Sequence, residues 1–198
     1  MENGVARVRF CWNGSAVNYS LLSMHDQAIT CNVQHTSKNC VIILVYACNS
    51  TVDKRPLWKY LSVVKNNLQG RPWIILGDFN SIRCSAERLG NVDFDDQGME
   101  DFNECIDVLD IVEHHAKGYY YTWCNKRDGG NRLYSKIDRV LVNNNWLNEY
   151  PYVKVEILDP SISDHCPLFV QIKENISFGP KSFKFQQFRM ITLNSLAF

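Results

Sequence analysis

The stretch WIILGDFN, residues 73–80, joins a short unbroken apolar run to a glycine, a carboxylate and a carboxamide. An apolar run of this length predicts a strand buried on both faces, and Gly77 allows a close backbone approach where that strand ends. Because side chains alternate along an extended chain, Asp78 and Asn80 point the same way while Phe79 faces the core. Ligand sites of layered α/β folds lie at such strand ends, although Asp and Asn are also common in simple turns.

The composition favours one globular domain without a strong overall charge. The chain has 198 residues, 45% of them apolar, and its 21 Lys and Arg residues balance 21 Asp and Glu residues. Such a chain can bury a sizeable core, and its charge balance excludes a protein that is basic over its whole surface. Charge is instead segregated, since residues 93–113 are acidic and residues 117–139 are mainly basic. The basic stretch suits a phosphate-facing surface, or simply a solvated loop and helix.

Cysteine usage indicates the compartment. Eight cysteines are scattered without a Cys-x-x-Cys pair, and these 198 residues contain neither a charged-then-apolar leader nor a long apolar span. We therefore expect a reduced intracellular protein, nuclear or cytoplasmic, that does not enter a membrane. Cys31, His35 and Cys40 have no fourth partner at zinc-site spacing, so we expect no zinc site there.

The first half of the chain combines strands with one helix. Runs rich in Val and Ile predict consecutive strands at residues 7–12, 17–22, 28–33 and 41–46. The last run is continuous, so that strand is expected in the centre of its sheet. It ends at Tyr46, which suits either a core position with a satisfied hydroxyl or a hydrogen-bond donor to phosphate. Apolar residues at helical spacing from 57 to 68 predict a helix with Pro56 in its first turn.

The second half predicts another helix and several short strands. Apolar positions 99, 102, 106 and 109 indicate an amphipathic helix whose outer face carries the acidic run. The sequence Asp-Gly-Gly-Asn at 128–131 predicts a hairpin turn. Further strands are expected at 119–123, 135–142, 152–158 and 166–172, with a short helix near Trp146.

Groups that suit phosphodiester hydrolysis occur at several of these strand ends. The reaction needs a base or orienting carboxylate for water, a stabiliser of charge on the phosphoryl oxygens, and donors that hold the phosphate in line. Candidates are Asp78 with Asn80, Asp138, and the Asp164-His165 pair. Each also has a structural explanation, since Asp138 can pair with the neighbouring Arg139 and an Asp-His dipeptide before Cys-Pro is common in turns.

In this order, the motifs resemble the endonuclease/exonuclease/phosphatase superfamily, whose fold is like that of deoxyribonuclease I. The matching residues are Val45-Tyr46, Gly77-Asp78-Phe79-Asn80, Lys136-Ile137-Asp138-Arg139 and Ser163-Asp164-His165. Further segments resemble the endonuclease domains of plant non-LTR (long interspersed element) retrotransposons: Asp26-Gln27-Ala28-Ile29, Tyr121-Thr122-Trp123-Cys124-Asn125, residues 163–168, and Gly179-Pro180-Lys181-Ser182-Phe183-Lys184-Phe185.

The resemblance implies a two-sheet α/β sandwich with helices outside, lacking its first strands. The domain would span residues 1–174, and residues 175–198 would be a tail that leads towards a reverse transcriptase in relatives. DNA is the implied partner, Mg²⁺ or Mn²⁺ the implied ion, and no small-molecule cofactor is expected. The matching motifs also imply roles for single residues. Asp78 would orient or deprotonate the attacking water, and Asn80 and Tyr46 would contact the phosphate. Asp138 would orient His165, His165 would stabilise charge on the phosphate, and Asp164 would bind the metal.

One part of the family pattern has no counterpart in these 198 residues. Family members carry an Asn on their first strand and a metal-binding Glu at the end of a second strand, and Glu2 and Asn3 do not replace them. We therefore expect weak metal binding and impaired hydrolysis of DNA phosphodiester bonds. The alternatives are a non-catalytic remnant of a mobile element that binds nucleic acid or protein, and a phosphatase acting on a small phosphorylated lipid or sugar.

Overall fold

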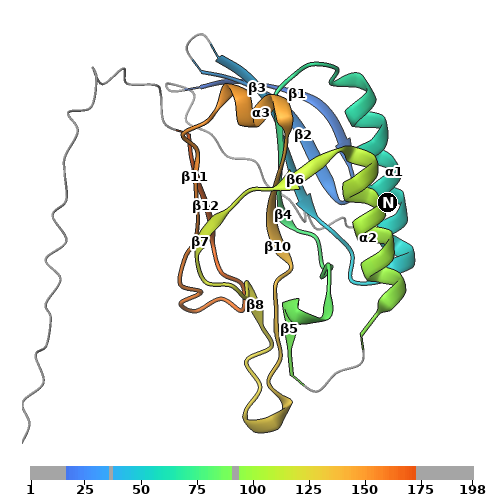
Figure 1. Ribbon diagram of the computed structural model, residues 1–198, viewed down its shortest axis with the longest axis vertical. Coiled ribbons are helices and arrows are strands. Elements are labelled where there is room, and N and C mark those ends of the chain that lie inside the picture. Colours follow the sequence, from blue (N-terminus) through green and yellow to red (C-terminus); the bar gives the residue numbers. More distant parts are fainter. Residues whose placement is uncertain (1–16, 36–37, 91–93, 173–198) are drawn as a thin grey trace, which may run out of the picture.

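The computed structural model describes residues 17–35, 38–90 and 94–172, which form layers of sheet and helix (Figure 1). The strand expected at residues 7–12 and the tail expected at residues 175–198 lie outside the described residues. Within the described ranges, no helix is both long enough and apolar enough to cross a membrane.

A six-stranded sheet runs through the molecule in the order β1-β2-β3-β4-β10-β6. Its first three strands form the expected antiparallel meander. β3 then pairs in parallel with β4, and β10 and β6 complete the sheet through antiparallel pairs. The bounds are β1 Asn18–His25, β2 Ala28–His35, β3 Lys38–Tyr46, β4 Trp73–Asp78, β6 Ile111–Glu113 and β10 Asp138–Asn143.

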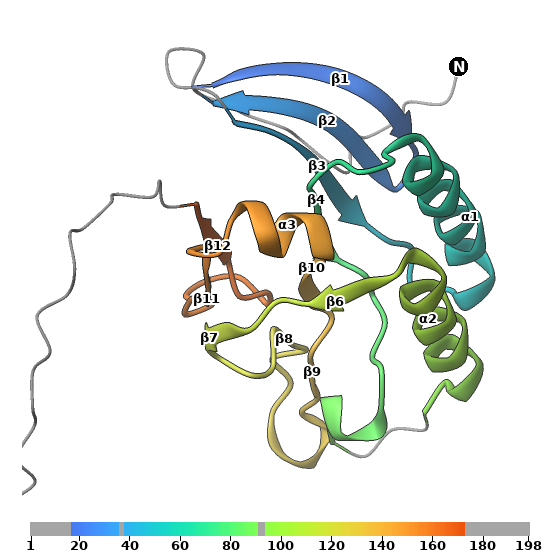
Figure 2. The ribbon, with the colours of Figure 1, turned by 45° about the horizontal axis from the view of Figure 1, so that its top comes forward.

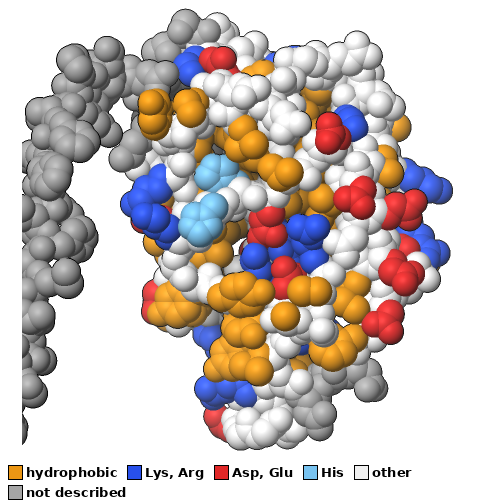
Figure 3. All heavy atoms as spheres, in the orientation of Figure 1, with side chains coloured by type: hydrophobic (Ala, Val, Ile, Leu, Met, Phe, Trp, Pro, Cys, Tyr) orange, Lys and Arg blue, Asp and Glu red, His pale blue; other side chains and the backbone are white. Residues whose placement is uncertain are grey.

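Two helices, α1 (Thr51–Asn67) and α2 (Asp96–Leu109), lie side by side against one face of this sheet (Figure 2). With the sheet they bury an apolar core that includes Leu57, Phe79 and Phe102. Acidic side chains gather on the outer side of α2, as its sequence pattern predicts (Figure 3). The two expected helices are therefore confirmed, and they close one side of the fold.

The beginning of α1 differs from the prediction that placed Pro56 in the first turn. The helix begins five residues earlier, at Thr51, because the Ser50 side chain accepts a hydrogen bond from the Asp53 N–H and caps it. Pro56 lies inside the helix beyond its first turn, where it removes one backbone hydrogen bond because proline has no N–H. The earlier beginning brings Lys54 into the first turn.

A second, three-stranded sheet covers the other face in the order β12-β11-β7. Its strands are β7 (Ala116–Gly118), β11 (Lys154–Ile157) and β12 (Leu168–Gln171), and the short helix α3 (Asn144–Glu149) lies at one end. A second apolar cluster between the layers includes Ile74, Val140, Trp146 and Val155. The protein is therefore the α/β sandwich that the sequence predicts.

A small ribbon of three two-residue strands departs from the predicted strand bounds. It consists of β5 (Arg88–Leu89), β8 (Trp123–Cys124) and β9 (Tyr134–Ser135), with the expected hairpin turn between β8 and β9. The strands predicted at 119–123 and 135–142 are thus shorter or interrupted. The interruption before β10 arises because the N–H groups of Ile137 and Asp138 bind the Thr122 hydroxyl, at 3.0 and 2.9 Å, rather than a neighbouring strand.

Candidate phosphodiesterase site

Three of the predicted site residues form one row across the ends of adjacent strands. In the sheet register, Tyr46 of β3 lies opposite Asp78 of β4, and Asp78 lies opposite Asp138 of β10. Side chains of directly opposed residues project from the same face of a sheet, so the three groups are neighbours. Asp78 and Asp138 are 6% and 8% exposed, whereas Tyr46 is 41% exposed. We call these three residues the strand row.

The end of β4 and the turn after it contain two residues with positive φ, Gly77 and Asn80. Gly77 has a φ of 133°, and a Cβ atom there would lie 2.0 Å from the Val45 carbonyl oxygen, so only glycine fits. Asn80 also has a positive φ, of 46°. Its backbone N–H donates to Asp78 Oδ1 at 2.8 Å, and its amide Nδ2 donates to Asp78 Oδ2 at 3.0 Å and to the Ala47 carbonyl at 2.8 Å. Asn80 therefore holds the Asp78 carboxylate.

This geometry bears on the role expected for Asn80. Both hydrogens of its amide group already have acceptors within the protein, the Asp78 carboxylate and the Ala47 carbonyl. The amide nitrogen has no further hydrogen to offer, so a hydrogen bond from it to phosphate requires that one of these contacts be released.

Burial and a like charge make Asp78 an unusual carboxyl group. Loss of hydration, and after it the neighbouring Asp138 carboxylate, raise the pKa of Asp78 to about 6. The hydrogen bond from the Asn80 backbone and the charges of His165 and Lys54 oppose this rise. A carboxyl group with a pKa near 6 is ionised at neutral pH and remains basic enough to take a proton from water.

Asp138 contacts His165 directly, as the sequence predicts. The His165 Nδ1 atom lies 3.0 Å from Asp138 Oδ2 and 3.2 Å from Oδ1. This hydrogen bond is the main cause that raises the pKa of His165, against the opposing effect of partial burial. Because Nδ1 faces Asp138, the ring offers Nε2 to a substrate, and the neighbouring carboxylate favours the charged imidazolium.

Asp164 lies beside these groups but in a different setting. It is exposed, and its Oδ2 atom accepts a hydrogen bond from the Trp123 indole at 3.1 Å. Its backbone carbonyl accepts from the Cys124 N–H at 2.9 Å, and a β-bridge joins Trp123 to His165. The backbone of the turn that contains Asp164 and His165 is therefore attached to the β8 ribbon, while the His165 side chain binds Asp138 of the six-stranded sheet.

The residues Thr122, Glu87 and Lys54 support the site but were not predicted to do so. Thr122 is fully buried, and its hydroxyl accepts the N–H groups immediately before and at Asp138. The one feature of the sequence that indicates a role for Thr122 is its place in the Tyr121-Thr122-Trp123 segment that resembles the family. Glu87 binds the buried Arg139 guanidinium, which also binds Glu113 at 2.9 Å.

Whether the site can hold a divalent metal ion depends on the ligating side chains that it contains. In the part of the chain that the structure describes, no group of three or more His, Cys, Asp and Glu side chains is placed to hold a metal ion. Among the predicted site residues, Asp164 alone offers an exposed carboxylate, and one of its oxygens accepts a hydrogen bond from Trp123. Mg²⁺ prefers six oxygen ligands and gives up its waters reluctantly, so the described residues do not fit a complete Mg²⁺ site.

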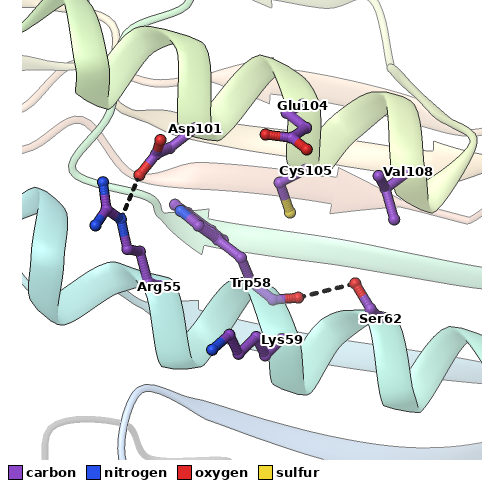
Figure 4. A pocket seen from close by; sticks show the side chains of 8 residues that line it. All are labelled: Arg55, Trp58, Lys59, Ser62, Asp101, Glu104, Cys105 and Val108. Atoms are coloured by element: carbon purple, nitrogen blue, oxygen red, sulfur yellow. Dashed lines mark hydrogen bonds and ion pairs between the residues drawn. The ribbon is translucent and has the colours of Figure 1, made fainter.

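A separate groove lies between α1 and α2 (Figure 4). An ion pair between Arg55 and Asp101, 2.8 Å long, closes one end of it. None of the predicted site residues lines this groove, whose walls are formed by Arg55, Trp58, Lys59, Ser62, Asp101, Glu104, Cys105 and Val108.

Fold and site together define a layered α/β protein with an acid–base cluster at the ends of its central strands. The sequence pattern of the Endonuclease/Exonuclease/phosphatase family matches residues 12–165. The chain belongs to this family, as its motifs predict. No curated protein matches the sequence.

Solved structures include similar folds. The endonuclease domain of TRAS1, a telomere-specific non-LTR retrotransposon, matches with a TM-score of 0.64 and 15% identity, over 83% of this chain and 72% of that one. Beta toxin from Staphylococcus aureus with bound magnesium ions matches with a TM-score of 0.48 and 14% identity, over 74% of this chain and 58% of the toxin chain. D. rerio TDP2 complexed with a single-strand DNA product matches with a TM-score of 0.45 and 13% identity, over 79% of this chain and 68% of the TDP2 chain. The TRAS1 likeness shows a shared fold.

Proposed function

We propose that this chain is a retrotransposon-derived endonuclease domain that hydrolyses phosphodiester bonds of DNA inside the cell. Family membership supports the reaction class, and the fold shared with the TRAS1 endonuclease domain supports the retrotransposon origin. The plant non-LTR assignment rests on the sequence motifs alone. The observation that carries the proposal is the meeting of Asp78, Asp138 and His165 from three distant parts of the chain.

The roles follow from this arrangement. Asp78, ionised above about pH 6, orients the attacking water and accepts its proton. Asn80 fixes the Asp78 carboxylate through two hydrogen bonds. His165, whose charged form is favoured by the hydrogen bond to Asp138, stabilises negative charge on the phosphoryl oxygens. Tyr46, exposed at the end of the strand row, donates its hydroxyl to the phosphate.

We propose that a divalent metal supports the reaction, and that residues 1–198 alone bind it weakly. A bound Mg²⁺ or Mn²⁺ ion would supply charge stabilisation at the phosphate. Asp164 is its proposed ligand, but one exposed carboxylate binds Mg²⁺ poorly. Loss of a single preorganised electrostatic stabiliser costs about 10²–10³ in rate, so hydrolysis by this chain should be slow. The absence of a three-donor group among the described residues favours the second candidate, a non-catalytic DNA-binding remnant.

The test is nicking of supercoiled plasmid at micromolar protein and long incubation, with and without Mg²⁺. It compares the parent protein with Asp78→Asn and with Asp128→Asn, an equivalent change at an exposed carboxylate of the hairpin turn. A second protein, extended upstream by a segment that supplies the Asn and Glu of the family pattern, is measured in parallel. A small phosphomonoester serves as the alternative substrate.

The proposal expects slow, Mg²⁺-dependent nicking that the extension accelerates and that Asp78→Asn abolishes, while Asp128→Asn leaves it unchanged. Fast nicking by residues 1–198 that depends on Asp78 would uphold the endonuclease and contradict the impairment. DNA binding without nicking, even by the extended protein, would make the binding remnant the better description. Preferred hydrolysis of the phosphomonoester would favour a phosphatase.

A further inference from the structure

Lys54, in the first turn of α1, is a buried cation directly behind the turn that carries the site. Lys54 is only 3% exposed, although lysine is among the residue types least often buried. Its Nζ atom donates to the Asn80 carbonyl at 2.8 Å and to the Ser81 hydroxyl at 2.8 Å. Both acceptors belong to the segment that follows Asp78, so the ammonium contacts the supports of the site.

The first turn of α1 is fixed by Gln27, a residue of the quoted Asp-Gln-Ala-Ile segment that the proposed chemistry does not use. Gln27 is 5% exposed, and its side-chain amide donates to the Asp53 carbonyl at 2.8 Å and accepts the Cys48 N–H at 2.7 Å. Its backbone carbonyl accepts the Tyr46 N–H at 2.9 Å. The end of β3 and the start of α1 are thereby tied together, which sets the position of Lys54.

Asn80 gains most from this contact. A positive φ is uncommon outside glycine, although asparagine adopts it more readily than most residues, and surrounding contacts hold Asn80 in it. The ammonium of Lys54 binds the Asn80 carbonyl, while the amide and N–H of Asn80 bind the Asp78 carboxylate. A chain of hydrogen bonds therefore runs from a buried positive charge to the proposed base.

We propose that Lys54 is a positioning residue of the site: its ammonium fixes the Asn80–Ser81 backbone and supplies a buried positive charge that favours ionised Asp78. This proposal rests on the proposed function for its catalytic meaning, but not for its structural content. Lys54 touches neither water nor phosphate in the proposed reaction and acts only through Asn80 and Asp78.

The charges around these two groups are few and can be named. Burial lowers the pKa of Lys54, the carboxylates of Asp95, Asp78 and Asp101 raise it, and Arg88 lowers it. Besides Lys54, the charged groups that act on Asp78 are Asp138, which raises its pKa, and His165, which lowers it. Removing the Lys54 charge while keeping its volume should therefore raise the pKa of Asp78.

A purely structural lysine would give a different result. If Lys54 only filled space and satisfied two acceptors, its loss would lower stability without moving the titration of Asp78. The deciding measurement is the NMR titration of the Asp78 carboxyl carbon in the parent protein, in Lys54→Met, and in Lys59→Met. Lys59 is an exposed residue of the same helix, so Lys59→Met is the matched control.

We expect Lys54→Met to raise the titration midpoint of Asp78, and Lys59→Met to leave it unchanged. Amide exchange at Asn80 and Ser81 should become faster, because the turn loses its ammonium contact. Plasmid nicking, where the parent protein nicks, should fall by about tenfold. An unchanged Asp78 midpoint in folded Lys54→Met would overturn the proposal.

A second variant covers the case in which Lys54→Met does not fold. Ser81→Ala removes one acceptor of the ammonium and leaves its charge in place. It should accelerate amide exchange at Asn80 while the Asp78 midpoint stays within about 0.2 unit of the parent value. Unchanged exchange would contradict the positioning role. If neither the parent protein nor the extended protein nicks DNA, the proposed function fails, and the NMR comparison still decides the role of Lys54.

Discussion

The two sides of the site are built differently. Asp78 and Asp138 stand on adjacent strands of the six-stranded sheet and are almost fully buried. Asp164 and His165 lie on a turn attached to a two-residue strand, where Asp164 is exposed and His165 is half-buried. Continuous backbone ladders fix the strand row, whereas a few single backbone and side-chain hydrogen bonds fix the turn.

This difference separates two tasks. Burial raises the pKa of Asp78 and keeps it rigid, which suits a group that must orient water. The exposed turn leaves Asp164 and one side of the His165 ring accessible to solvent and to a substrate. The strand row therefore sets the acid–base chemistry, and the turn supplies groups that contact what binds. The link between the two sides is Thr122, which binds the start of β10 and pairs with Cys166.

The largest expected effect comes from the charge network that braces the strand row. The Arg139 side chain is fully buried and binds Glu87 and Glu113, so Arg139→Met removes the guanidinium from two partly buried carboxylates. Glu113 keeps its ion pair with Lys136, and Glu87 keeps the hydrogen bond from the Arg83 N–H. We expect the free energy of unfolding to fall by about 3–5 kcal/mol, measured by urea unfolding. The control Arg132→Met, in the exposed hairpin, should cost less than about 0.5 kcal/mol. Equal losses in both variants would contradict the bracing role.

The second effect concerns the link between the two sides. Thr122→Val keeps the shape of the side chain but leaves the N–H groups of Ile137 and Asp138 without an acceptor. The expected loss is about 2–4 kcal/mol of unfolding free energy. Thr30→Val, at another buried threonine whose hydroxyl has one side-chain partner, should cost about 1 kcal/mol. A smaller loss in Thr122→Val than in Thr30→Val would show that the link is not needed.

The third effect is the pH dependence of stability. The raised pKa of Asp78 means that the folded protein holds this proton more tightly than the unfolded chain. Its contribution to stability is fully present below about pH 4 and is lost as the pH rises through about 6. Asp78→Asn removes this loss, so the variant should gain about 2 kcal/mol relative to the parent between pH 4 and pH 7. A pH-independent difference, measured by urea unfolding, would show that Asp78 titrates normally.

The sequence pattern predicts the strand row well because Tyr46 and Asp78 end strong apolar runs, and Asp138 stands just before one. The WIILGDFN stretch identified a buried strand with Asp78 at its end, and Phe79 is buried as alternation requires. The Asp138–His165 contact came from the family resemblance, since no pattern within one sequence pairs residues 27 positions apart. Which residues become neighbours on adjacent strands depends on the pairing register, and a single sequence does not show that register.

The supporting residues were not predictable for a related reason. Arg139 stands beside Asp138 in the sequence, which suggested a local ion pair, but neighbouring side chains on a strand point to opposite faces. Arg139 therefore binds Glu87, and Asp138 binds His165. The sequence pattern does not indicate a role for Lys54, because Pro56 predicts the first turn of the helix and so places residue 54 outside it, whereas the helix begins at Thr51.

The most direct test of the site is the titration of His165 in the parent protein and in Asp138→Asn, followed by NMR of the imidazole ring. The Asp138 hydrogen bond raises the pKa of His165, so its midpoint should lie above about 6.5 in the parent protein and fall in the variant. The midpoint of Asp78 should fall too, because Asp138 raises its pKa. If both midpoints are the same in the two proteins, Asp78, Asp138 and His165 do not form one site.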